Sequence, residues 1–217
     1  MGHDNLIKQI LAFIQLTNTE TEIITSKFRN NKYKQKEYVL IEGEISTDIH
    51  FIVNGLVRIF YLNNGKETNT YLACDNGFVS SYSSFIHQKK SIENIQCIEN
   101  TETLSISYKD MQELYSLIPQ WEKVGRILAE QNFLCVSDRL LKLHSIPAKE
   151  KYLDFLKTSS DKIIQRTPLI HIASFLGMEP ESLKQNKKKH FLTFIKEKKN
   201  FVPHFCTLKT NRNERNS

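Results

Sequence analysis

The stretch HFIVNGLVRIFYLNNGKETNTYLA, residues 50–73, carries the clearest structural signal in the N-terminal half of the chain. Runs rich in β-branched and aromatic residues are separated here by the dipeptides Asn54-Gly55 and Asn64-Gly65. Asn-Gly favours the positive φ angles of a two-residue hairpin turn, and runs of this composition favour strands. The stretch therefore predicts antiparallel strands joined by tight turns.

Further runs of the same kind lie on both sides of this stretch. They are YVLIE at 38–42, IENIQCI at 92–98 and TLSIS at 103–107, and Asp75-Asn76-Gly77 supplies a third turn signal. Short strands with regular turns are typical of an antiparallel barrel or sandwich. Residues 77–91 interrupt this series of strands and turns with serines followed by basic residues. This composition predicts a functional loop or a short helix between strands.

Segments with helical periodicity precede and follow the predicted strands. Residues 4–16 place apolar side chains at helical spacing and predict a packing helix. From Lys109 to Pro147 apolar residues again recur every three or four positions. A helix of about 25 residues spans ~38 Å, so we expect it to link two domains or to pair with a second copy. An ordinary core helix is the alternative.

Two short helices joined by a glycine turn follow. Thr167-Pro168 is expected to start the first helix, with Thr167 as the cap and Pro168 in the first turn, where its missing N–H costs nothing. Gly177 stands where a left-handed residue would end that helix, and Pro180 opens the second. The pattern predicts a helix-turn-helix, although many helical hairpins share it.

The positive charge is concentrated at the C-terminal end. The net charge of the 217 residues is +6. Residues 161–217 hold 12 Lys/Arg and 5 Asp/Glu, or +7, which leaves 18 against 19, or −1, for residues 1–160. This asymmetry favours a polyanion-binding end, and a solubilising tail is the alternative.

Other classes of protein find little support in the sequence. The four cysteines form no CxxC pair and follow no secretory signal, which favours a reduced, cytoplasmic protein without a metal site. Apolar runs are too short for a membrane span. The seven histidines are scattered, and HExxH, GxSxG and P-loop motifs are missing, so we expect no enzyme and no cofactor.

The order of strands, long helix and basic helix-turn-helix resembles the Crp/Fnr family of bacterial transcriptional regulators, in the form common in Bacteroidetes. The resemblance is carried by YKQKEYVLIEGEISTDIHFIVNGLVRIFY at 33–61, which is similar to the family's cyclic-nucleotide-binding domain, and by IASFLGMEPESL at 172–183. It implies a homodimer held by the long helix, a barrel that senses a small-molecule effector, and a second helix in the major groove of double-stranded DNA.

The predicted fold class is thus α+β. An antiparallel β-roll of the jelly-roll, cyclic-nucleotide-binding type is expected over residues 1–110. The long dimerisation helix follows over 111–145, and a helix-turn-helix domain with an atypical basic tail over 146–217.

The effector loop departs from the family pattern. Cyclic-nucleotide binders of this family carry a Gly-Glu pair for the ribose and an Arg-Ser or Arg-Thr pair for the phosphate. Here Phe78 follows Gly77, and Lys89, Lys90 and Ser91 stand where the arginine pair would lie. A lysine lacks the two-pronged guanidinium, so we do not expect cAMP dependence. Another effector would be met by Gly77, Ser80, Ser81, Ser83, Lys90 and Ser91, or these are solvated loop residues.

The second helix of the helix-turn-helix also departs from the pattern. Residues expected to meet DNA are Glu181, Ser182, Lys184, Gln185, Lys187, Lys188 and Lys189. Gln185 replaces a usual arginine and is suited to adenine, whereas lysines suit phosphates, which position without specifying sequence. After about Leu183 the sequence leaves the family pattern, as a shifted reading frame would cause. The competing hypothesis is therefore a ligand-binding or dimeric module that has lost sequence-specific DNA contact.

Overall fold

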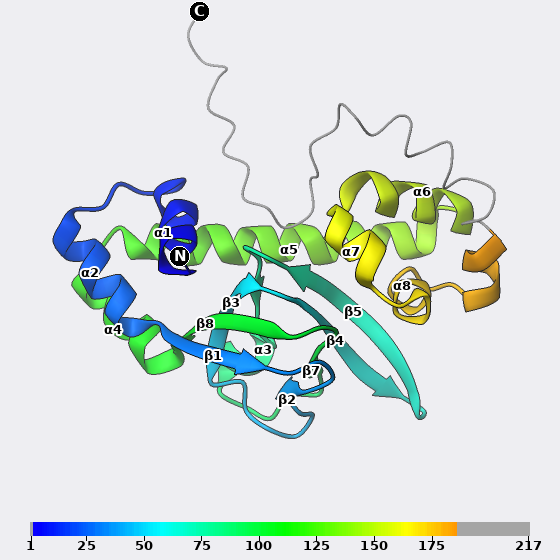
Figure 1. Cartoon of the computed structure of the whole chain (residues 1–217), viewed down its shortest axis with the longest axis horizontal. Coiled ribbons are helices and arrows are strands. Elements are labelled where there is room, and N and C mark those ends of the chain that lie inside the picture. The colour runs from blue at the N-terminus through cyan, green and yellow to red at the C-terminus, as the bar shows by residue number, and fades with distance from the viewer. Residues whose placement is uncertain (1, 186–217) are drawn as a thin grey trace, which may run out of the picture.

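The structure, a computed structural model, describes residues 2–185. Two four-stranded antiparallel sheets face each other below a long helix, with helices of the N-terminal part at one end and helices of the C-terminal part at the other (Figure 1). The expected α+β fold with an antiparallel roll, a long helix and a helical C-terminal part is confirmed.

The roll is built from eight strands. One sheet has the order β1-β8-β3-β6 and the other the order β2-β7-β4-β5. The strands are β1 (Arg29–Tyr33), β2 (Tyr38–Leu40), β3 (Asp48–Asn54), β4 (Leu56–Asn63), β5 (Lys66–Cys74), β6 (Phe78–Val79), β7 (Asn94–Cys97) and β8 (Thr101–Ser107). Apolar side chains from both sheets fill the space between them, among them Ile52, Val57 and Ile95.

The two Asn-Gly dipeptides behave differently. Asn64 and Gly65 both have positive φ angles and join β4 to β5 in the predicted two-residue hairpin. The hairpin expected at Asn54-Gly55 is wrong, because β3 and β4 lie in different sheets. Gly55 is needed there for close approach: a Cβ on it would lie 2.4 Å from Thr101 Oγ1. Asn76, with φ 65°, confirms the third turn.

The N-terminal helices differ from the expectation of one helix over 4–16. Helix α1 (Gly2–Leu11) ends early, and α2 (Asn18–Lys27) follows. Periodicity does not reveal α2, since Ile24 is its one buried residue. Its start is instead encoded by a capping box, in which Thr17 accepts from the backbone of Glu20 and the Glu20 side chain accepts from the backbone of Thr17.

The segment 111–145, expected as one helix, is divided. Helix α4 (Tyr108–Leu117) is separated from α5 (Trp121–Ser145) by residues 118–120. Pro119 explains the break, because proline lacks an N–H and excludes the preceding residue from the helical region. Ile118 accordingly has φ −127° and ψ 92°. With 25 residues, α5 has the predicted length.

The C-terminal part contains four helical segments. They are α6 (Ala148–Thr158), α7 (Asp161–Arg166), α8 (Leu169–Phe175) and residues 180–185. The cap predicted at Thr167 is wrong: Pro168 occupies the cap position, and the buried Thr167 hydroxyl has no partner. Helix α7 was not expected; Ser160 caps it by accepting from Ile163 N.

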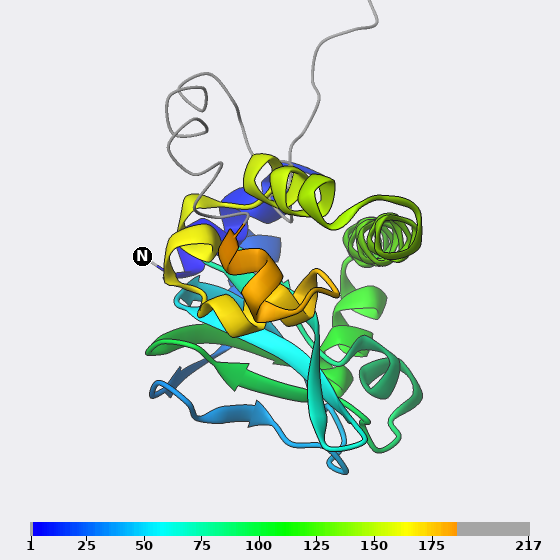
Figure 2. The same ribbon diagram turned by 90° about the vertical axis from the view of Figure 1, so that its right-hand side faces the viewer.

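These helices lie against the roll rather than apart from it. Figure 2, along α5, shows them above the strands. Leu56 of β4 and Leu72 of β5 belong to the same apolar cluster as Phe155, Leu156 and Ile172 of the C-terminal helices. The segment between β6 and β7 contains the short helix α3 (Tyr82–His87), one of the two alternatives that the sequence left open.

Candidate DNA-binding and effector sites

Gly177 makes the turn between the two helices of the helix-turn-helix. It has φ +62°, and Met178 N donates to Ala173 O at 2.9 Å, which ends α8 with the predicted left-handed residue. In the second helix, residues 180–185, Leu183 is completely buried. Glu181, Ser182, Lys184 and Gln185 are exposed, so the four described residues predicted to meet DNA share the solvent side. Lys187, Lys188 and Lys189 lie outside the described residues.

Helix α8 is hydrogen-bonded to the β4–β5 hairpin of the roll. Ser174 Oγ accepts from Asn69 N at 2.9 Å and donates to Glu67 O at 3.0 Å. Arg139 of α5 donates through Nη2 to Asn69 O at 2.8 Å and to Phe175 O at 3.0 Å. The β-roll, the long helix α5 and the helix-turn-helix therefore meet around the main chain of Asn69.

Arg58 of β4 lies at the centre of this contact and is almost completely buried. Its guanidinium donates to Glu67 Oε2 at 2.5 Å, to Gln96 Oε1 at 2.7 Å and to His171 Nδ1 of α8 at 3.1 Å. It also lies 4.0 Å above the ring centre of Phe60. Because Nδ1 accepts this bond, the neutral His171 ring carries its proton on Nε2.

Burial, reinforced by the positive charge of Arg58, lowers the pKa of His171 to about 4. The hydrogen bonds from Arg58 lower the pKa of Glu67 below its ordinary value. No sequence motif includes Arg58; its one signal is a charged residue within an otherwise apolar strand, LVRIFY. The function of such a residue depends on the partner that covers the strand.

A second polar contact joins α7 to the roll. Lys162 Nζ lies 2.6 Å from Asp75 Oδ1 and 2.7 Å from Glu99 Oε1. Arg166 Nη1 reaches the other Glu99 oxygen at 3.0 Å. Two cations of the C-terminal part are thus paired with acidic residues of the roll.

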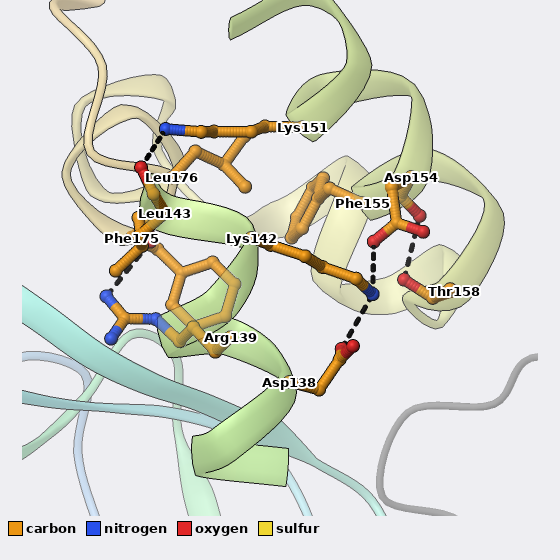
Figure 3. A pocket seen from close by; sticks show the side chains of 10 residues that line it. All are labelled: Asp138, Arg139, Lys142, Leu143, Lys151, Asp154, Phe155, Thr158, Phe175 and Leu176. Atoms are coloured by element: carbon orange, nitrogen blue, oxygen red, sulfur yellow. Dashed lines mark hydrogen bonds and ion pairs between the residues drawn. The ribbon is translucent and has the colours of Figure 1, made fainter. Parts of the chain in front are cut away.

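The elbow between α5 and α6 is held by lysines (Figure 3). Lys142 Nζ bridges Asp138 and Asp154 at 2.6 and 2.8 Å, and Lys151 Nζ donates to Leu143 O at 2.6 Å. Next to these bonds is a cavity of about 30 Å³ with a mostly apolar lining. A gap of this size has room for water but not for a small-molecule effector, whose sites are typically about 300–1,000 Å³, so we interpret the cavity as a packing gap.

In the expected effector region, the structure brings Ser81 and Ser91 together. Both are buried, and Ser91 Oγ donates to Ser81 Oγ at 2.9 Å. Ser81 Oγ in turn donates to Glu93 Oε2 at 2.8 Å, and Thr70 Oγ1 donates to Glu93 Oε1 at 3.3 Å. In the described part of the chain, no lysine or arginine pairs with Glu93. Glu93 was not among the residues predicted from the sequence, because it lies just beyond the loop at 77–91.

The other predicted effector residues do not join this cluster. Ser80 Oγ donates to Asp48 O at 3.0 Å, and Ser83 and Lys90 are exposed. Gly77 lies in the turn before β6, where a Cβ would come within 2.9 Å of Cys74 O. Between residues 2 and 185, no group of metal-binding side chains occurs, and no helix is long and apolar enough to cross a membrane.

Comparison with known proteins agrees with this architecture. Residues 30–117 match the family described as the cyclic nucleotide-binding domain. Among solved structures, FixK2 from Bradyrhizobium japonicum is similar with TM-score 0.66 and 13% identity, over 76% of this chain and 85% of FixK2. The regulator CLP from Xanthomonas campestris, described as responsive to c-di-GMP, has TM-score 0.64 and 16% identity, over 82% of this chain and 93% of CLP.

A protein from Eubacterium rectale described as a transcriptional regulator of the Crp/Fnr family has TM-score 0.62 and 14% identity, over 82% of this chain and 85% of its own. At such identities the likeness concerns the fold. Residues 30–117 therefore match the cyclic nucleotide-binding domain, and the described chain shares the fold of these solved regulators. The resemblance stated from the sequence is confirmed at this level.

Proposed function

We propose that this protein is a DNA-binding transcriptional regulator of the Crp/Fnr type, and not an enzyme. The observation that carries the proposal is the second helix of the helix-turn-helix, whose residues Glu181, Ser182, Lys184 and Gln185 are exposed while Leu183 anchors it. A helix fixed by one buried residue with a polar outer side is suited to the DNA major groove.

Binding to the DNA upstream of its own gene should exceed binding to an unrelated duplex by ~10³ or more, a range typical of specific regulators. The measurement is a gel-shift titration of the purified protein at physiological salt. We expect the affinity to fall steeply as salt rises, since lysine–phosphate contacts release counterions.

Equal and weak binding to both duplexes would contradict the proposal. It would favour the second candidate, a dimeric or ligand-binding module without a DNA code. The observation that favours this second candidate is Gln185, which stands where the family resemblance places a guanine-reading arginine.

The dimer of this regulator is proposed to form along α5. Five apolar side chains of that helix are each 55–69% exposed in the described part of the chain: Phe133, Leu134, Val136, Leu140 and Leu141. Buried positions Trp121 and Val124 face the protein's own core. An apolar stripe of this extent on a 25-residue helix fits a parallel second copy.

The roll is proposed to work without a cyclic nucleotide. Glu93 places a carboxylate on the hydroxyls of Ser81 and Thr70, so these donors are already occupied by a negative group. A cyclic phosphate would add a second negative charge there without an arginine to offset it.

Calorimetric titration with cAMP and cGMP should accordingly show no saturable binding at ligand concentrations up to about 1 mM, which corresponds to a binding free energy weaker than about −4 kcal/mol. A stoichiometric heat signal with either nucleotide would refute this part of the proposal. The control is a thermal-unfolding curve showing that the titrated protein is folded.

A further inference from the structure

We infer that the outer face of the sheet β2-β7-β4-β5 positions the helix-turn-helix for DNA through its contacts with α8, in which Ser174 bonds to the main chain of β5 and the buried Arg58 bonds to His171. The inference rests on the proposed DNA-binding function and assigns a role to a surface of the roll that lies outside the effector region.

Side chains of β4 alternate between the two faces of the sheet, and an apolar residue on the outer face is buried by the C-terminal helices. Val57 and Ile59 point into the roll, whereas Leu56 joins the apolar cluster of the C-terminal helices. Leu56 is completely buried and Leu72 of β5 is 5% exposed. An antiparallel sheet face in water is usually polar, so these leucines favour the docked arrangement of the two domains.

The polar contacts fix one orientation of the docked helix. Asn69 is completely buried, and its N–H is satisfied by Ser174 Oγ at 2.9 Å. His171 accepts from Arg58, whose remaining donors are held by Glu67 and Gln96 within the roll. Sliding or rotating α8 would leave buried donors unpaired at ~1–3 kcal/mol each. The contact therefore fixes both the position and the angle of α8 on the sheet, in addition to holding the two domains together.

Docking leaves the DNA side free. In the docked arrangement Glu181, Ser182, Lys184 and Gln185 remain exposed. The contact therefore does not mask the reading helix. A domain tethered only by the α5–α6 elbow would sample many orientations, and the apparent affinity falls by the fraction that is competent. The docked sheet face removes this loss.

The test is a bulky side chain at the contact. Ser174→Phe places a ring where Oγ lies 2.9 Å from Asn69 N, so the helix cannot dock. Ile170→Phe is the matched control, because Ile170 lies on the same helix and is 60% exposed. Ser174→Thr keeps the hydroxyl and is the conservative variant. Ser174→Ala removes both hydrogen bonds without added bulk, in case the phenylalanine variant does not fold.

Two readouts are measured on the full-length chain: hydrogen exchange of the Asn69 amide and affinity for the upstream DNA. We expect Ser174→Phe to speed exchange and weaken DNA binding, each about tenfold or more, since a competent fraction of one tenth gives a tenfold loss. Ser174→Ala should change both in the same direction by less. Ile170→Phe and Ser174→Thr should resemble the wild type.

Faster exchange with unchanged or tighter DNA binding in Ser174→Phe would overturn the positioning role. Unchanged exchange of Asn69 in both Ser174→Phe and Ser174→Ala would overturn the docked contact itself. These outcomes differ from failure of the proposed function, in which the wild type already shows no preference for its upstream DNA.

Discussion

Leu134→Glu is expected to convert the dimer proposed to form along α5 into monomers. The Leu134 side chain is 64% exposed in the single chain and lies on the apolar stripe of α5. Burying one leucine side chain contributes about 1.5–3 kcal/mol. A symmetric dimer contains two copies of Leu134, so the substitution removes two buried leucines and places two carboxylates in the interface. At about 1.4 kcal/mol per factor of ten, the dimer Kd should rise at least ~100-fold. Sedimentation equilibrium over a range of protein concentrations measures it.

The same substitution should weaken DNA binding, because a monomer reaches one half-site where a dimer reaches two. Gln131→Glu is the control, since it adds the same charge to an exposed polar position of the same helix. A Leu134→Glu protein that remains dimeric with an unchanged Kd would show that α5 is not the dimer contact. A dimeric variant with lost DNA binding would separate assembly from recognition.

Acid is expected to destabilise the protein through His171. Its pKa is lowered from 6.5 to about 4 in the folded chain, first by burial and then by Arg58. Between these values the unfolded chain binds a proton that the folded chain does not, so the free energy of unfolding falls as the pH drops from about 6.5 to about 4. At about 1.36 kcal/mol per pKa unit the full loss approaches ~3 kcal/mol.

His50 acts in the same direction, because burial lowers its pKa to about 4 as well. The contribution of His171 is isolated by His171→Gln, whose amide oxygen can accept from Arg58 but does not titrate. In urea unfolding, the wild type should lose about 2 kcal/mol more than the variant between pH 7 and pH 5. Parallel pH curves for the two proteins would contradict the shift at His171.

Local sequence patterns predict much of the fold. The hairpin at Asn64-Gly65, the length of α5 and the turn at Gly177 all follow from turn chemistry and periodicity. These features depend on neighbours in the sequence, which is why they are readable from it. The misses at Asn54-Gly55 and Thr167 have a different origin. A turn dipeptide or a capping residue is a local signal, and it does not specify which sheet or which helix the following residues join.

The class of fold follows from the sequence alone, because turn dipeptides and helical periodicity are local signals. The residues expected to meet DNA came from the family resemblance, and Glu181, Ser182, Lys184 and Gln185 are exposed next to the buried Leu183. Which charged groups meet is visible only in the tertiary structure. Arg58 and His171 are 113 residues apart, and Glu93 meets Ser81 and Thr70 only when strands and loop pack together. Burial and electrostatic partners depend on contacts between distant segments, and no local pattern specifies those.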